Sequence, residues 1–212
     1  MYIIDQTYFI KELNIPNLNE MDSDVLTDLN IDIDKYVRQL LRDALGAELF
    51  KDLDSNITDG VLNVDATDKW KNLVNGVEYV KDEVTYTWKG LTYTEGAFKG
   101  SLLAKFVYFY WLRDSVSLLT GTGEKNITAE GAISVNASQK LISVWNSFIE
   151  EYQFVDFDCY PSVYYKNNVP VIDYLGASVN GYVSLLTFLT DNETDYPNAP
   201  LKVYETMNQL GL

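Results

Sequence analysis

The chain of 212 residues contains no histidine and only one cysteine, Cys159. Without histidine it cannot form a Ser-His-Asp or Cys-His catalytic pair, or a zinc site with imidazole ligands. A single cysteine excludes a disulfide within the chain and a cluster of thiolates, and we interpret Cys159 as a buried, unreactive thiol. These absences exclude many classes of hydrolase and metalloprotein.

The sequence also lacks long apolar runs and nucleotide-binding motifs. No apolar segment approaches the roughly 20 residues that a membrane span requires, and residues 1–5 have neither the basic nor the apolar region of a secretory signal. The phosphate-binding patterns G-x-x-x-x-G-K-S/T and G-x-G-x-x-G are missing, and the glycine-rich segment 120–124 follows a helical pattern instead of a strand. We therefore expect a soluble protein, made in the cytosol, that binds no cofactor and no membrane.

Positive charge is scarce, because 16 basic residues stand against 31 acidic ones and the formal net charge is −15. Nucleic-acid phosphates and anionic membranes repel a chain with this balance. Specific DNA binding is therefore not expected.

Carboxylates are abundant enough to form two candidate sites, the pairs Glu150–Glu151 and Asp156/Asp158, and the group Asp22, Asp24 and Asp28. The pairs flank aromatic residues, an arrangement that suits glycan hydrolysis or glycan binding. The second group has a spacing that suggests calcium, but it lacks the glycine and the terminal glutamate of an EF-hand loop. We interpret both groups as solvated acidic segments, and predict no catalytic residue and no metal ligand.

Apolar residues that recur every three or four positions predict three long helices and a short one. The long helices are expected over residues 33–53, 101–119 and 135–154, and the short helix over residues 66–75. Asn30 or Asp32 suits the N-cap of the first helix. We interpret Gly46, inside that helix, as a point of close packing, and Gly76 as the left-handed residue that ends the short helix.

A pattern of period two predicts a β-hairpin between the short helix and the next long one. The alternating residues are Val84, Tyr86 and Trp88 against Thr85, Thr87 and Lys89. Lys89–Gly90 is interpreted as the turn that leads to a strand containing Leu91 and Tyr93. A further strand over residues 77–80, with its turn at Lys81–Asp82, would complete a small meander. The hairpin is therefore placed at about residues 77–94.

The C-terminal quarter has a different composition, rich in Tyr, Val, Asn and Pro from about Asp156 onward. Its prolines break any long element, so we expect an extended arm or a small β-containing appendage. The predicted fold is mainly α: a small helical bundle of three long helices and a short one, with a protruding β-hairpin and an extended C-terminal arm. Residues 1–155 form the helical domain and residues 156–212 the arm.

Aromatic residues are unusually frequent, with 16 Tyr, 9 Phe and 4 Trp. Tyrosine and tryptophan are enriched in protein interfaces because they bury much area and keep one polar group. The predicted hairpin and arm carry more of them than such small elements can cover alone. The predicted intersubunit contacts are therefore Tyr86, Trp88, Tyr93, Tyr160, Tyr164, Tyr165 and Tyr174.

Three segments share a pattern with a known family. The first long predicted helix contains residues 40–50, of the type LxxALGxxLxxxL, and residues 100–103 open a helix whose aromatic run lies within 106–114. A Thr-Gly-rich loop then leads through residues 130–132 to another helix. Over about residues 30–155 the chain thus resembles the head-tail connector, or adaptor ring, proteins of tailed bacteriophages, especially crAss-like and related Bacteroidetes phages.

The resemblance implies a ring, commonly of about twelve copies, between the portal and the tail. The implied partners are further copies of the chain, the portal protein, and a tail protein or second connector. The implied location is the head-tail junction of the virion, after assembly in the host cytoplasm. DNA would pass through the ring without specific binding, which an acidic channel wall favours.

We therefore predict a structural virion protein and not an enzyme. One alternative is a transient phage assembly or head-completion factor, which would remain a monomer bound to one partner. The other is a carboxylate-based glycan hydrolase or binding protein, whose sugar release would stop when Glu150 or Glu151 is changed.

Overall fold

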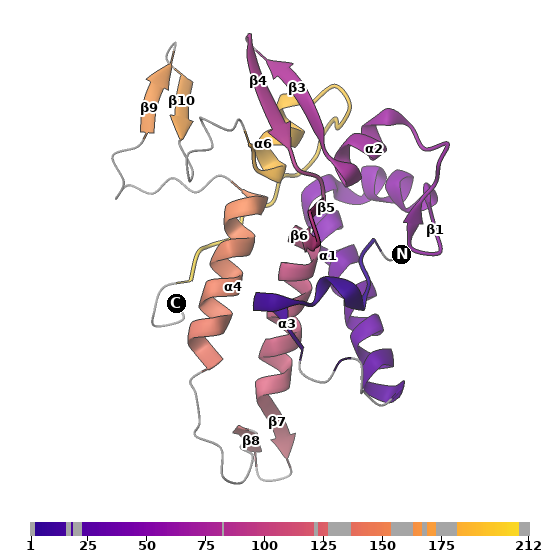
Figure 1. The fold of residues 1–212 in the computed structure, drawn as a ribbon, viewed down its shortest axis with the longest axis vertical. Coiled ribbons are helices and arrows are strands. Elements are labelled where there is room, and N and C mark those ends of the chain that lie inside the picture. The colour runs from indigo at the N-terminus through magenta and orange to yellow at the C-terminus, as the bar shows by residue number, and fades with distance from the viewer. Residues whose placement is uncertain are drawn as a thin grey trace.

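In the computed structural model of the chain (Figure 1), the described residues are 3–15, 18, 23–81, 83–120, 123–126, 137–153, 163–166, 169–172 and 182–207. These residues form five α-helices and five two-stranded antiparallel sheets. The fold is therefore mixed α and β, and the predicted mainly α bundle with one hairpin and an extended C-terminal arm is wrong. Strands of two to five residues carry too little periodicity to be recognised beside long helices.

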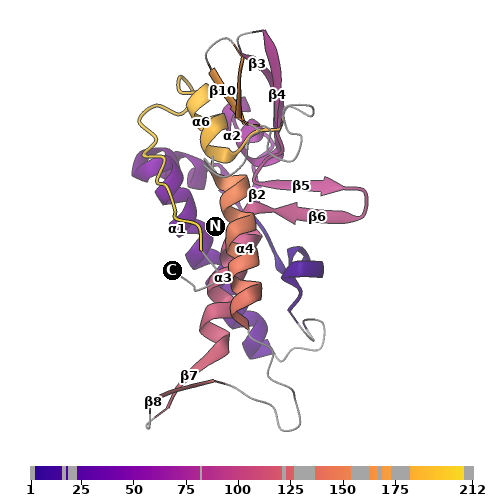
Figure 2. The ribbon, with the colours of Figure 1, turned by 90° about the vertical axis from the view of Figure 1, so that its left-hand side faces the viewer.

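Three long helices lie side by side, with α3 between α1 and α4 (Figures 1 and 2). α3 spans Leu102–Val116 and α4 spans Ala137–Tyr152, close to the predicted ranges. α3 is apolar on more than one face because it packs against both neighbours. Its buried residues are Leu102, Leu103, Ala104, Phe106, Val107, Tyr108 and Phe109. The Ser101 hydroxyl accepts hydrogen bonds from the first turn of α3 and so caps it.

α1 spans Ser23–Ser55, which is ten residues longer at its start than the prediction, so neither Asn30 nor Asp32 is its cap. The helix breaks at Gly46, where φ is 79° and ψ is 174°. A Cβ atom at Gly46 would lie 3.1 Å from Cδ of Pro200, so the predicted close packing at this glycine is confirmed. Because the backbone departs from helical geometry here, the first part of α1 has its own C-terminal end within the last third of the element.

Three short hairpins follow one another between α1 and α3. They are β1 (Ile57–Thr58) with β2 (Val61–Leu62), β3 (Val77–Lys81) with β4 (Val84–Trp88), and β5 (Thr92–Glu95) with β6 (Phe98–Ser101). α2 (Asp68–Asn75) separates the first two, and Gly76 follows it with the expected positive φ, 88°. The β5–β6 hairpin projects sideways from the helices (Figure 2).

The predicted hairpin turn at Lys89–Gly90 is wrong, because β4 pairs with β3 and β5 pairs with β6. Gly90 instead lies in the link between two hairpins, with φ of 96°. A Cβ atom there would lie 2.6 Å from the backbone nitrogen of Gly76. The glycine is required by this close approach of two backbone segments and not by a hairpin turn.

Two further hairpins lie toward opposite ends of the molecule in Figure 1. β7 (Ser117–Thr120) pairs with β8 (Gly123–Asn126) beyond the end of α3, where the helix had been predicted to continue to residue 119. β9 (Val163–Lys166) pairs with β10 (Val169–Ile172). At the N-terminus, two 3-10 turns, Gln6–Tyr8 and Lys11–Leu13, pack against the body.

The C-terminal residues 182–207 are part of the body and not an arm. Val183 donates a backbone hydrogen bond to Thr87 of β4, at 3.0 Å, and α6 (Leu185–Asp191) follows. Buried residues of this segment are Leu185, Leu186, Phe188, Leu189 and Tyr196. The prolines prevent a long helix, as predicted, but they do not prevent packing. The domain boundary predicted at residue 155 lies outside the described residues.

Candidate interaction surface

The aromatic residues of the β3–β4 hairpin point mostly into the protein. Trp88 is 3% exposed, and its ring stacks on Phe188 of α6 with centroids 5.6 Å apart. The Trp88 indole N–H donates to the carbonyl of Leu73 at 2.9 Å. Trp88 therefore contributes no contact area to another subunit while the hairpin stays in place. Tyr86 is half-buried, with its ring 5.8 Å from that of Tyr79.

Tyr93 lies on the projecting β5–β6 hairpin and is half-buried. Its ring covers Gly100 on the paired strand so closely that a Cβ atom there would lie 2.3 Å from Cζ of Tyr93. The Tyr93 hydroxyl donates to the carboxylate of Glu151 at 3.3 Å. Tyr164 and Tyr165 lie on β9, where they pair with Val171 and Pro170. Tyr160 and Tyr174 lie outside the described residues, so their interface role stays a prediction.

The most elaborate set of polar contacts in the described part of the chain surrounds residues 202–207, here called the C-terminal strap. The strap runs in extended form beside α1 and α4 (Figure 2). The side chains of Trp145, Asn146 and Tyr152 on α4 and of Gln153 directly after it, together with Asp43 on α1, form what we call the strap groove.

Two side-chain amides, one on α4 and one directly after its last residue, bind the strap as a neighbouring β-strand would. Gln153 donates to the carbonyl of Tyr204 at 2.6 Å and accepts from its N–H at 2.7 Å. Asn146 makes the same pair of bonds with Met207, both at 2.9 Å. The seven-residue separation of the amides spans ~10.5 Å along a helix. Three residues of extended chain span ~10 Å, so the two spacings match.

Two aromatic side chains add hydrogen bonds to the same strap. The Trp145 indole N–H donates to the carbonyl of Glu205 at 2.8 Å, and the Tyr152 hydroxyl donates to the carbonyl of Lys202 at 2.9 Å. Trp145 and Tyr152 are also seven residues apart, each directly before one of the amides. An aromatic residue followed by an amide thus occurs twice, seven residues apart, and both pairs face the strap.

Tyr204 anchors the strap in an aromatic cluster. Its ring centroid lies 5.2 to 5.9 Å from those of Phe106, Trp145, Phe148 and Tyr152. Its hydroxyl donates to Asp43 at 2.7 Å, and Lys202 forms an ion pair with the same carboxylate oxygen, also at 2.7 Å. Burial raises the pKa of Tyr204 far above its ordinary value, and the hydrogen bond to Asp43 raises it further. The phenol therefore stays protonated and remains a donor.

The break in α1 provides the remaining contact. A helix end leaves its last carbonyl groups without helical partners. The N–H of Lys202 donates to the carbonyl of Asp43 at 3.2 Å, and the N–H of Leu201 donates to that of Ala44 at 3.4 Å. The strap therefore caps the first part of α1 just before Gly46.

Sequence reasoning missed the strap groove. The sequence patterns placed Trp145, Asn146, Tyr152 and Gln153 only within the helix predicted over residues 135–154 and gave none of them a role. In the structure, the groove is marked by Gln153, which is polar yet only 6% exposed. A side-chain amide is buried to this extent only when it has hydrogen-bond partners. In the sequence, the corresponding signal would be an amide repeated after seven residues on an otherwise apolar helix face.

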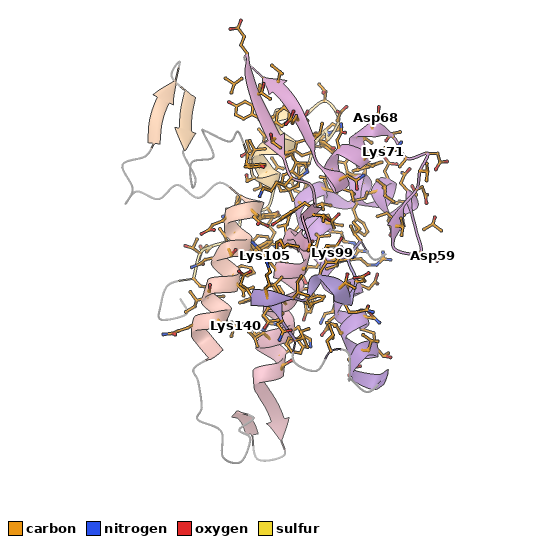
Figure 3. The ribbon with its side chains drawn as sticks, viewed as in Figure 1. Asp59, Asp68, Lys71, Lys99, Lys105 and Lys140 are labelled. Carbon is orange, nitrogen blue, oxygen red and sulfur yellow. The ribbon has the colours of Figure 1, made fainter. Side chains whose placement is uncertain are left out.

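The candidate catalytic carboxylates do not converge. Glu151 forms an ion pair with Lys105 of α3 at 2.8 Å, between α3 and α4 (Figure 3), whereas Glu150 is exposed. Successive residues of a helix point in different directions, so these two acids do not face one space. Asp156 and Asp158 lie outside the described residues. Of the acids considered for calcium, Asp24 and Asp28 lie within α1, and Asp22 lies outside the described residues.

The described residues offer no cluster of three or more acids, cysteines or histidines that could hold a metal ion. A cavity of about 450 Å³ lies beside α2 and β2. Its walls carry one charged residue, Lys71, labelled in Figure 3, and its rim includes Val61 and Val64, which are 68% and 92% exposed. This cavity has no pair of groups suited to acid–base chemistry.

Membrane insertion through a helix finds no support in the described part of the chain, where no helix is both long and apolar enough to cross a bilayer. Comparisons of the chain with protein-family models, with curated proteins and with solved structures found no match. The resemblance to connector proteins therefore rests on the sequence patterns alone.

Proposed function

We propose that this chain is a structural, non-enzymatic virion protein, a head-tail connector that assembles into a ring between the portal and the tail of a tailed bacteriophage. The strap groove is the observation that carries the proposal. Its paired amides and aromatic donors are arranged to hold an extended polypeptide, which is the chemistry of protein assembly and not of bond making or breaking.

The architecture supports this function in two further ways. Three packed helices make a stiff body, and the β5–β6 hairpin projects from it as a second possible contact (Figure 2). A closed ring requires two different, complementary patches on each subunit, so a body with two such features suits it. The net charge of −15 would make the wall of a DNA channel repel phosphate.

In this proposal the partners are further copies of the chain, about twelve in one ring, with the portal on one side and a tail protein or second connector on the other. DNA passes through without specific binding. The protein acts at the head-tail junction after assembly in the host cytoplasm, and it needs no cofactor.

A transient assembly or head-completion factor is the second candidate. One observation favours it: the strap is bound within its own chain. The groove of a folded monomer is therefore already filled, and a filled groove does not bind another copy. A monomer that binds one partner and later leaves would fit that arrangement.

Negative-stain imaging of the purified protein tests the first proposal against the second. We expect particles of uniform diameter with a central hole. Single small particles at every protein concentration would contradict the connector and favour the transient factor.

A further inference from the structure

We propose that the strap groove joins neighbouring copies: residues 202–207 of one copy bind the groove of the next copy in place of that copy's own strap. This inference rests on the proposed function, because it names the contact that would hold the ring together. The partner that fits the groove is thus a second copy of this chain.

The groove recognises the strap mainly through its backbone. Seven backbone groups of the strap are bound: the N–H groups of Lys202, Tyr204 and Met207, and the carbonyls of Lys202, Tyr204, Glu205 and Met207. One aromatic anchor, Tyr204, supplies the side-chain contact with the cluster on α3 and α4. An identical strap from another copy would satisfy every one of these bonds. The exchange therefore costs no contact within the groove.

The segment before the strap has the features of a hinge. Residues 197–201 contain Pro197 and Pro200, and two non-glycine residues have positive φ, Asn198 at 58° and Leu201 at 48°. Asn adopts this conformation readily, but it is strained for the leucine, and strained hinge loops favour exchange of a segment between copies. A strap that swings away releases this strain, whereas a strap that stays in its own groove keeps it.

The residues upstream of the hinge are fixed independently of the strap. Tyr196 is 2% exposed, and its hydroxyl donates to the carbonyl of Lys69 in α2. Its ring also contacts Trp70 at 5.9 Å and Phe188 at 5.7 Å. The strap can therefore leave its groove while α2, α6 and the β3–β4 hairpin keep their packing.

The geometry of this contact is that of a ring. Each copy offers one strap and one groove, and these are different surfaces. A contact between different surfaces is head-to-tail, and it produces a closed ring when the rotation between neighbours closes. Exchange in which two copies swap straps reciprocally would instead stop at a dimer, so the mass of the assembly distinguishes the two arrangements.

The first test uses two full-length variants at one exposed hinge position, Asn198→Pro and Asn198→Gly. Proline holds φ near −65°, which the closed strap does not allow, whereas glycine adopts a positive φ without strain. Because proline disfavours the closed strap, we expect the affinity between copies to be about tenfold higher for Asn198→Pro than for Asn198→Gly. In sedimentation velocity, Asn198→Pro should therefore assemble at about tenfold lower protein concentration. Equal assembly of the two variants would overturn the inference.

The second test mixes two full-length variants that are complementary. Tyr204→Ala has a defective strap and an intact groove, while Asn146→Ala/Gln153→Ala has an intact strap and a defective groove. Each alone should remain a monomer by native mass spectrometry, and the equimolar mixture should form heterodimers, because one good strap meets one good groove. Circular dichroism checks that each variant is folded. Tyr204→Leu, which removes the aromatic ring and the hydroxyl but keeps apolar bulk, replaces Tyr204→Ala if that variant is unfolded.

The outcomes separate this inference from the proposed function. If the wild-type protein forms rings and the strap variant and the groove variant, each alone, form them equally well, strap exchange is wrong and the connector stands. If the wild-type protein is a monomer at every concentration, both are wrong. Heterodimers in the mixture alone would support strap exchange directly.

Discussion

The β3–β4 hairpin, whose Tyr86 and Trp88 were predicted to contact other subunits, and the C-terminal strap, which we propose does so, are held in the protein by different means. The hairpin is fixed by buried rings, with Trp88 stacked on Phe188. The strap is held by hydrogen bonds from side chains to its backbone and by one ring, Tyr204. Removing the hairpin from its site would expose the buried Trp88, whereas the strap is bound mainly through its backbone and one half-buried ring and can leave with less apolar exposure. The strap is therefore the better candidate for assembly.

The largest effect should come from the hairpin. Replacing Trp88 with alanine removes a buried ring and its bond to the carbonyl of Leu73, and we expect a loss of about 3–5 kcal/mol in the free energy of unfolding. Urea denaturation measures this. Val80→Ala is the matched control on the same hairpin, since Val80 is 70% exposed and should change stability by less than about 0.5 kcal/mol. Similar losses in both variants would show that the Trp88 packing does not stabilise the fold.

The strap anchor should have a smaller effect. Because Tyr204 is only half-buried, we expect Tyr204→Ala to cost about 2–3 kcal/mol, below the value for a fully buried ring. Val203→Ala serves as the control, because Val203 is its chain neighbour and is 67% exposed. Urea denaturation at a fixed protein concentration compares the two. If Val203→Ala is as costly as Tyr204→Ala, Tyr204 is not the anchor.

Changing one of the amides should have a smaller effect on the free energy of unfolding, and this effect should depend on pH. Gln153→Glu keeps the shape, but an ionised carboxylate cannot donate to the carbonyl of Tyr204, so we expect a loss of about 1–3 kcal/mol at neutral pH. On acidification toward the ordinary glutamate pKa of about 4.3, the protonated acid regains a donor, and the loss relative to wild type should shrink. Urea denaturation at neutral pH and at about pH 4.3 measures the loss of stability relative to wild type. A loss that stays constant with pH would contradict the bidentate contact.

The smallest effect should appear in alkaline solution. Burial, reinforced by the bond to Asp43, raises the pKa of Tyr204 in the folded protein above the ordinary value of 10.0. The unfolded chain therefore loses this proton first, so the stability linked to Tyr204 is complete below pH 10 and falls as the pH rises beyond it. Tyr204→Phe should lose less stability than wild type between about pH 9 and pH 11 in thermal unfolding. Identical pH profiles would show that the hydroxyl is not bound as described.

Much of the helical part of the fold was predictable because α3 and α4 each bury a continuous apolar face. The spacing of Leu141, Trp145 and Phe148 already indicates α4, and Gly76 marks the end of α2. The N-terminal part of α1 was missed although Leu26, Leu29 and Ile33 keep the helical spacing, because Asn30 and Asp32 beside them also suit an N-cap. The link at Gly90 was misread because glycine serves a tight turn and a close backbone contact equally well.

The strap groove could not be derived from local patterns. Its contacts join residues about 50 to 160 positions apart, as between Gln153 and Tyr204 or between Asp43 and Lys202. They depend on the break at Gly46 and on Pro200 packing against it. The prolines near the C-terminus indicate the absence of a long helix, but they carry no information on what the extended chain binds.

The most direct measurement is the mass of the wild-type protein in solution as a function of concentration, by sedimentation velocity with native mass spectrometry. A structural protein joined by exchanged straps should give one species of many times the 24.2 kDa chain mass, and Tyr204→Ala should dissociate it. A wild-type protein of 24.2 kDa at every concentration would contradict both the ring and the role of the strap.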